Sequence, residues 1–179
     1  TDMLGFDLGS HSFPVGTEVL IAQQLFDQGL NWCFGFNREE RLACFKEALN
    51  HDPDCAMLHW GIAYAAGPFY NMLWIDFSEP EAIGCTRFCR SYLDKAIALS
   101  DATPPLEKAL IHALSLRIQK PHIVSQPEYN AWDDAYAKAM RQVNVDFQDS
   151  QFVMALCVEA MMTRTPWNMW DVKTCLPPK

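Results

Sequence analysis

Apolar residues recur at intervals of three and four along most of the chain, which is the spacing of one face of an α-helix. The first such segment covers residues 17–34. A second begins after Asn37, a favoured helix N-cap residue, and stops near Asn50, ahead of Pro53. A third covers residues 54–66 and ends at Gly67-Pro68. The pattern therefore predicts three helices before residue 67.

Four more helices are predicted in the remainder, over residues 79–100, 103–118, 132–147 and 150–163. The polar, proline-containing stretch before Trp132 is interpreted as a linker. No segment alternates apolar and polar residues for long enough to predict a strand. We expect an all-α fold, with residues 1–16 as an N-terminal arm and residues 17–179 as one helical domain.

A short motif occurs twice, 32 residues apart, and consists of a glycine, an aromatic residue three positions later and a glycine six positions later: Gly29, Trp32 and Gly35, then Gly61, Tyr64 and Gly67. Phe45, Ala48 and Pro53 follow the first copy. This order resembles the tetratricopeptide repeat, whose period is about 34 residues. The resemblance implies antiparallel helical hairpins stacked as a right-handed solenoid, with an aromatic ring filling the space that small residues leave between helices.

The chain departs from this repeat pattern at several points. Arg41 stands where the repeat has a small residue, and residues 67–78 insert an aromatic-rich loop into the second unit. A third unit is indicated only by residues 95–97, which match Glu47-Ala48-Leu49. The repeat pattern therefore covers about residues 20–100.

Three longer strings carry a closer resemblance: FDQGLNWCFGFNREE, HDPDCAMLHWGIAYAAGP and RTPWNMWD. They are similar to the N-terminal region of a family of large bacterial and fungal tetratricopeptide-repeat proteins. The resemblance implies that more helical pairs follow residue 179, so we expect a truncated chain. It implies no particular activity.

Tetratricopeptide-repeat proteins bind peptides or ligands on a concave side lined by the first helix of each pair. In that register this side would hold apolar residues, namely Phe26, Leu30, Cys33, Phe34, Leu58, Ile62 and Ala65. The lysines and asparagines of the carboxylate-clamp type of repeat protein are missing from these positions. Two interpretations stay open: a face buried by later helices, or a groove for an apolar helix or a small molecule.

Aromatic and polar residues outside the repeat form a second set of candidates. Arg164, Trp167, Trp170 and Asp171 fall within eight residues, a combination that suits a ligand site. An Arg–Asp pair that braces a turn explains the same residues. Asn71, in the loop after the third helix, is a further candidate for the wall of a pocket.

His51, Cys55 and His59 are spaced by four residues and could provide ligands for a transition metal. However, Pro53 interrupts the helix between His51 and Cys55, and the repeat itself accounts for the Asp-Pro pair. We therefore expect no metal or other cofactor, and keep a transition metal as the alternative.

The net charge of −8 and the pI near 5.0 disfavour binding to nucleic acid or to anionic membrane surfaces. No apolar run is long enough for a membrane-spanning helix. The seven cysteines are an odd number and several of them fall within helical patterns, which indicates reduced core thiols in a cytoplasmic protein.

The leading hypothesis for function is a non-catalytic scaffold that docks an apolar peptide or another protein subunit, by analogy with the fold. The alternative is an enzyme or small-molecule binder with a pocket enclosed by the helices, with or without a metal. A third hypothesis is a structural part of a larger assembly. The sequence contains no phosphate loop, dinucleotide glycine pattern or nucleophile elbow.

Overall fold

The computed structural model describes residue 5 and residues 7–176, and within them it contains seven α-helices and no named strand. The helices are α1 (Leu20–Phe34), α2 (Arg38–His51), α3 (Ala56–Ala66), α4 (Glu79–Leu99), α5 (Pro105–Arg117), α6 (Gln126–Asp146) and α7 (Gln151–Met162). The prediction of an all-helical fold is confirmed. The main difference is α6, which begins well before Trp132 because Ser125 and Pro127 form a helix start rather than a linker.

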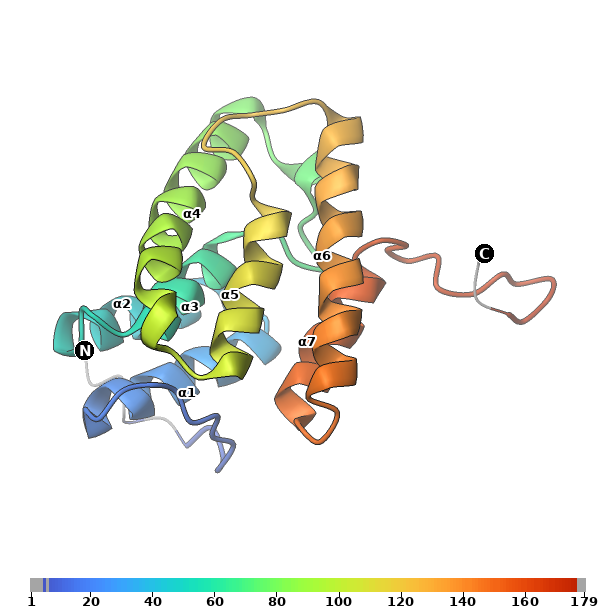
Figure 1. The fold of residues 1–179 in the computed structure, drawn as a ribbon. Helices are drawn as coiled ribbons and strands as arrows, with labels where there is room; N and C mark the ends of the chain where they lie inside the picture. Colours follow the sequence, from blue (N-terminus) through green and yellow to red (C-terminus); the bar gives the residue numbers. More distant parts are fainter. Residues whose placement is uncertain (1–4, 6, 177–179) are drawn as a thin grey trace.

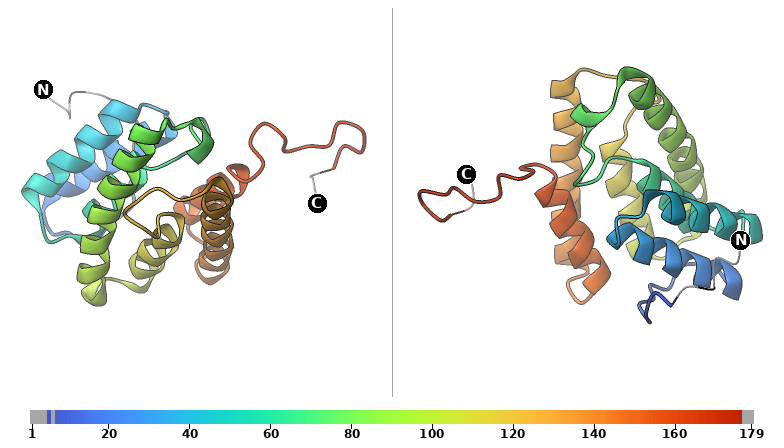
Figure 2. Two further views of the ribbon diagram at one scale, coloured as in Figure 1. Left: turned by 90° about the horizontal axis from the view of Figure 1, so that it is seen from above. Right: turned by 180° about the vertical axis from the view of Figure 1, so that it is seen from behind.

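Neighbouring helices along the chain pack as pairs: α1 on α2, α3 on α4, and α5 on α6. In Figure 1, α4, α5 and α6 stand side by side, α1 and α2 lie toward the lower ends of α4 and α5, and α7 lies beside the lower part of α6. α7 packs on α6, and the segment that follows α7 extends away from the helices in each view of Figure 2. No described helix has both the length and the hydropathy that crossing a membrane requires.

The glycines of the repeated motif make room for one aromatic ring. A Cβ atom built on Gly29 would lie 2.8 Å from the Phe45 ring, and one built on Gly61 would lie 2.7 Å from it. Phe45 is fully buried and also meets the ring of Phe26 edge-on, with centroids 5.4 Å apart. The Phe45 ring of α2 therefore occupies the space left by the small residues Gly29 on α1 and Gly61 on α3.

The apolar face predicted to line a concave groove lies mostly inside the core. Phe26, Leu30, Leu58 and Ile62 are all fully buried, which agrees with the first of the two interpretations, a face covered by other segments, and contradicts an open docking surface at these four residues. The N-terminal arm and α7 cover this side of the molecule: the ring of Phe152 on α7 lies 4.2 Å from Phe13, 6.2 Å from Trp60 and 6.4 Å from Phe34.

The arm before α1 is held by specific contacts although it has little regular structure. Phe13 and Val15 are buried, and Gln23 on α1 binds the backbone of both residues. The N–H of Gly16 donates to Glu107 on α5 over 2.7 Å. The described part of the arm is therefore packed onto the helical domain.

Candidate functional site

A pocket of about 450 Å³ opens between the C-terminal end of α1 and the exposed face of α7, and we call it the α1–α7 pocket. Its walls also include α2, α3 and the loop after α3. The side chains that line it are mostly apolar: Cys33, Phe34, Phe36, Arg41, Tyr64, Phe69, Tyr70, Gln151, Met154, Ala155, Val158, Glu159 and Met162. Its volume lies within the range of about 300–1,000 Å³ that is typical of small-molecule sites.

The rim of the pocket is shaped by the tight turn between α1 and α2. Phe36 has a φ of 58°, a left-handed conformation that is unfavourable for a bulky side chain. The turn is closed by backbone hydrogen bonds, including Phe36 N–H to the Cys33 carbonyl, and the Asn37 side chain then caps α2. As a result the Phe36 ring is 56% exposed at the rim, 6.5 Å from the ring of Phe69.

Arg41 is a charged residue in this otherwise apolar wall. It is 2% exposed, and its Nε and Nη2 atoms have no hydrogen-bond partner among the described residues. Its guanidinium carbon lies 4.5 Å from the ring centroid of Phe69, at cation–π distance. Burial lowers the pKa of Arg41, but an arginine remains charged at neutral pH.

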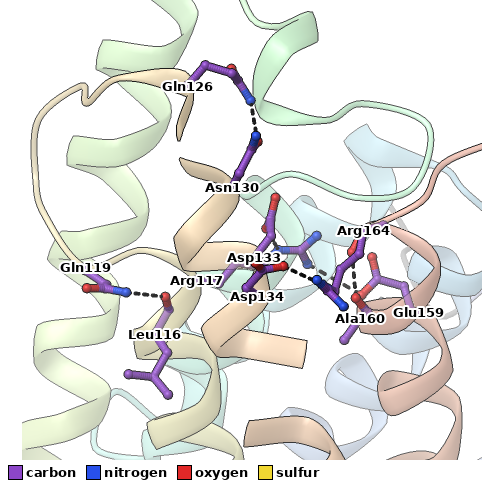
Figure 3. A network of polar contacts seen from close by, with 11 residues as sticks. Leu116, Arg117, Gln119, Gln126, Asn130, Asp133, Asp134, Glu159, Ala160 and Arg164 are labelled. Carbon is purple, nitrogen blue, oxygen red and sulfur yellow. Dashed lines mark hydrogen bonds and ion pairs between the residues drawn. The ribbon is translucent and has the colours of Figure 1, made fainter. Parts of the chain in front are cut away.

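Glu159 is the acid in the same pocket, and it belongs to a buried ion network. Its Oε2 atom lies 3.5 Å from Nη1 of Arg117, and Nε of Arg117 donates to Asp133 over 3.2 Å (Figure 3). The network joins α5, α6 and α7. Burial raises the pKa of both carboxyl groups, because the loss of hydration outweighs the opposite effect of the Arg117 charge.

A second, more polar hollow of about 390 Å³ lies on the other side of this network, between the loop after α3, α6 and the residues after α7. Arg164 lines it and binds Asp134 on α6 over 2.5 Å (Figure 3). The predicted Arg164–Asp171 brace is therefore wrong: Asp171 instead accepts hydrogen bonds from the N–H groups of Lys173 and Thr174.

The two candidate tryptophans do not converge on a ligand site with Arg164. Trp167 is 79% exposed, and its backbone N–H donates to the Tyr70 hydroxyl over 3.1 Å. Trp170 is 60% exposed, and Asn71 is exposed in the loop after α3. Asn71 and Trp170 line neither the α1–α7 pocket nor the second hollow.

The possible metal ligands have other contacts. His51 faces Glu47, with nitrogen and oxygen 3.5 Å apart, and Cys55 is buried directly before α3. His59 is buried, with Nε2 2.9 Å from the Pro53 carbonyl oxygen. Among the described residues, no cluster of three or more histidine, cysteine or acidic side chains is arranged to hold a metal ion, so these three residues form no such site.

Of the residues predicted from the sequence, the α1–α7 pocket contains Cys33, which is buried, and Phe34, which is 40% exposed. Sequence reasoning missed Arg41 and Glu159 as site residues. For Arg41 a signal was present, because a large cation occupies a position where the repeat has a small residue. For Glu159 no local signal existed, since its partners lie on other helices.

Comparison with known proteins adds no relative: no family model, no curated protein and no solved structure matches the chain.

Proposed function

We propose that the chain is a non-catalytic binding protein whose site is the α1–α7 pocket and whose ligand is a small apolar molecule. The observation that carries this proposal is the pocket itself, with its apolar walls and its volume of about 450 Å³. Several large apolar side chains at its mouth are left 40–56% exposed, namely Phe34, Phe36, Met154 and Val158. A bound ligand would remove this surface from water, at a gain of about 25 cal/mol per Å².

The chemistry of the pocket supports binding rather than thiol catalysis. Cys33 is the nucleophilic residue type in the wall, and burial raises the pKa of its thiol to about 12. A thiol with that pKa is protonated at neutral pH and is a poor nucleophile. The polar groups Arg41 and Glu159 are suited to orienting a ligand.

The proposal includes a tetratricopeptide-type arrangement of the helical pairs in a cytoplasmic protein. The pairing of α1 with α2 and of α3 with α4 supports it, as does the fit of Phe45 against Gly29 and Gly61. The seven cysteines are all free, which suits a reducing compartment.

The test is titration with a neutral apolar fluorophore, N-phenyl-1-naphthylamine, and two matched variants. Val158→Asp places a carboxylate in the wall of the α1–α7 pocket. Val145→Asp makes the same change on α6, outside that pocket. Both valines are exposed, at 50% and 67%, so both variants should fold. We expect binding of one probe per chain, lost in Val158→Asp and kept in Val145→Asp. Equal binding by the two variants would overturn the proposal.

A second candidate function, docking of an apolar peptide or protein subunit, is favoured by the exposed row of Met154, Val158 and Met161 along α7. Met161 does not line the pocket. Met161→Asp therefore separates the two functions: it should weaken capture of a protein partner and leave the fluorophore titration unchanged. Phe34→Asp, at the pocket mouth, should weaken both.

A further inference from the structure

We propose that the ligand of the α1–α7 pocket is an apolar monocarboxylate, whose carboxylate pairs with the Nε–Nη2 edge of Arg41. This inference rests on the proposed function of the pocket and adds the chemical class of the head group. It begins from a charge that is almost fully buried in the pocket wall, with those two N–H donors unpartnered among the described residues.

An unpaired guanidinium in an apolar wall is energetically unfavourable, because burial removes its hydration and nothing replaces the lost hydrogen bonds. The contact with Phe69 supplies a cation–π interaction and no acceptor atom. Cys33 and Tyr64 line the same wall, but burial raises the pKa of each, so both stay neutral at pH 7. The pocket wall thus holds a cation with no paired anion.

Glu159 forms no ion pair with Arg41, since its Oε2 atom pairs with Arg117 instead. Glu159 therefore makes an ion pair with Arg117, although its Oε1 atom has no partner among the described residues, whereas Arg41 makes no ion pair there and interacts with the charge of Glu159 only through space. This asymmetry favours an anionic ligand over an amine.

Both edge atoms are buried from solvent in the ligand-free structure, so a ligand reaches them only when a side chain of the wall moves. The geometry of this unpartnered edge selects a carboxylate. The Nε–H and the adjacent Nη2–H of an arginine are nearly parallel and match the two oxygens of a carboxylate, which binds such an edge through two hydrogen bonds. An alcohol offers one oxygen. A doubly charged phosphate would bring a second negative charge close to Glu159, and this repulsion disfavours its binding.

The remaining walls define the rest of the ligand. Phe34, Tyr70, Met154 and Val158 are apolar or aromatic over most of their surface, and they extend from Arg41 to the pocket mouth. A linear or aryl-substituted carboxylic acid of about ten carbons combines the two requirements, and decanoate is a simple member of that class.

The experiment displaces N-phenyl-1-naphthylamine with decanoate and with decanol, which share the same carbon chain. We expect decanoate to bind the wild type about tenfold or more tightly than decanol, the range that hydrogen bonds to a charged group provide. Arg41→Met should abolish this preference and retain decanol binding. Arg87→Met removes an exposed arginine of α4 outside the pocket and should keep the preference.

Thermal unfolding of the ligand-free variants supplies an independent readout. If Arg41 is held unpaired for a ligand, Arg41→Met should unfold at the same or a higher temperature than the wild type, because it removes a buried charge without a partner. Arg41→Lys keeps the positive charge but lacks the two parallel N–H donors. Its preference for decanoate should therefore fall between those of the wild type and Arg41→Met.

The outcomes separate this inference from the function on which it rests. Absence of fluorophore binding to the wild type would refute the small-molecule function. If the fluorophore binds but decanoate is not preferred, or if the preference survives in Arg41→Met, the inference of a carboxylate bound by Arg41 is refuted. The proposed small-molecule function would then still stand.

Discussion

Replacing Gly61 by alanine tests whether the fit of Phe45 against two glycines holds α1, α2 and α3 together. The new Cβ atom would lie 2.7 Å from Cδ1 and 2.8 Å from Cε1 of the Phe45 ring, whereas carbon atoms pack best at about 3.5–4.0 Å. On its other side the ring lies so close to Gly29 of α1 that even a Cβ atom built there would be 2.8 Å away, so it has little room to retreat.

The magnitude follows from two opposing effects. Overpacking of a core costs about 1–3 kcal/mol, and a ring confined between two helices places Gly61→Ala near the upper end. Alanine in place of a helical glycine contributes about 1 kcal/mol in the other direction. We expect a net loss of about 2 kcal/mol in the free energy of unfolding, or about 4–8 °C in melting temperature for a chain of this length.

The assay is urea and thermal unfolding followed by circular dichroism, with Gly84→Ala as the matched control. Gly84 also lies in a helix, and a Cβ added there meets no atom within 4 Å, so this variant should gain up to about 1 kcal/mol. In a Phe45→Leu background the penalty of Gly61→Ala should shrink. If Gly61→Ala were as stable as Gly84→Ala, the packing argument would be refuted.

Three further predictions concern buried charge and thiols. Arg117→Met leaves its two carboxylate partners without a cation, so it should cost about 2–3 kcal/mol at pH 7 and less at pH 4, by urea unfolding. Burial raises the pKa of Glu107 above 4.5, and the folded state therefore holds this proton more tightly than the unfolded state. As pH rises from the unfolded pKa through the raised folded pKa, the wild type should lose stability relative to Glu107→Gln; a constant difference across that window contradicts this. Cys175 is the exposed thiol and the other six are buried, so Ellman's reagent should label one thiol rapidly in the native protein and none rapidly in Cys175→Ser.

Local pattern was sufficient to predict most of the helices. Spacings of three and four, the Asn37 cap and the breaks at Pro53 and Gly67-Pro68 all act within one or two turns, so they can be recognised without knowing the tertiary structure. The largest error was the start of α6, because a proline in the first turn of a helix was interpreted as part of a linker, while α1 and α3 begin two or three residues later than predicted.

The repeated glycines are a case in which sequence also predicted a tertiary contact. The spacing of Gly29 and Gly61 indicated close helix approach around an aromatic ring, and the structure places Phe45 there. This was possible because the contact joins helices adjacent in the chain, where short connections leave few alternative packings.

What the sequence by itself determined is the set of helices and the close approach of paired helices at the repeated glycines; that Phe45 fills the gap is seen only in the structure. The tertiary structure decided which apolar side chains remain exposed to solvent. Phe26 and Phe34 lie on one helix, yet the first is fully buried and the second is 40% exposed beside α7. It also decided which charges are paired: Arg117, Asp133 and Glu159 come from three helices, while Arg41 forms no ion pair with any residue that the structure describes. Exposure and ion pairing depend on segments distant along the chain, and periodicity within one helix carries no information about them.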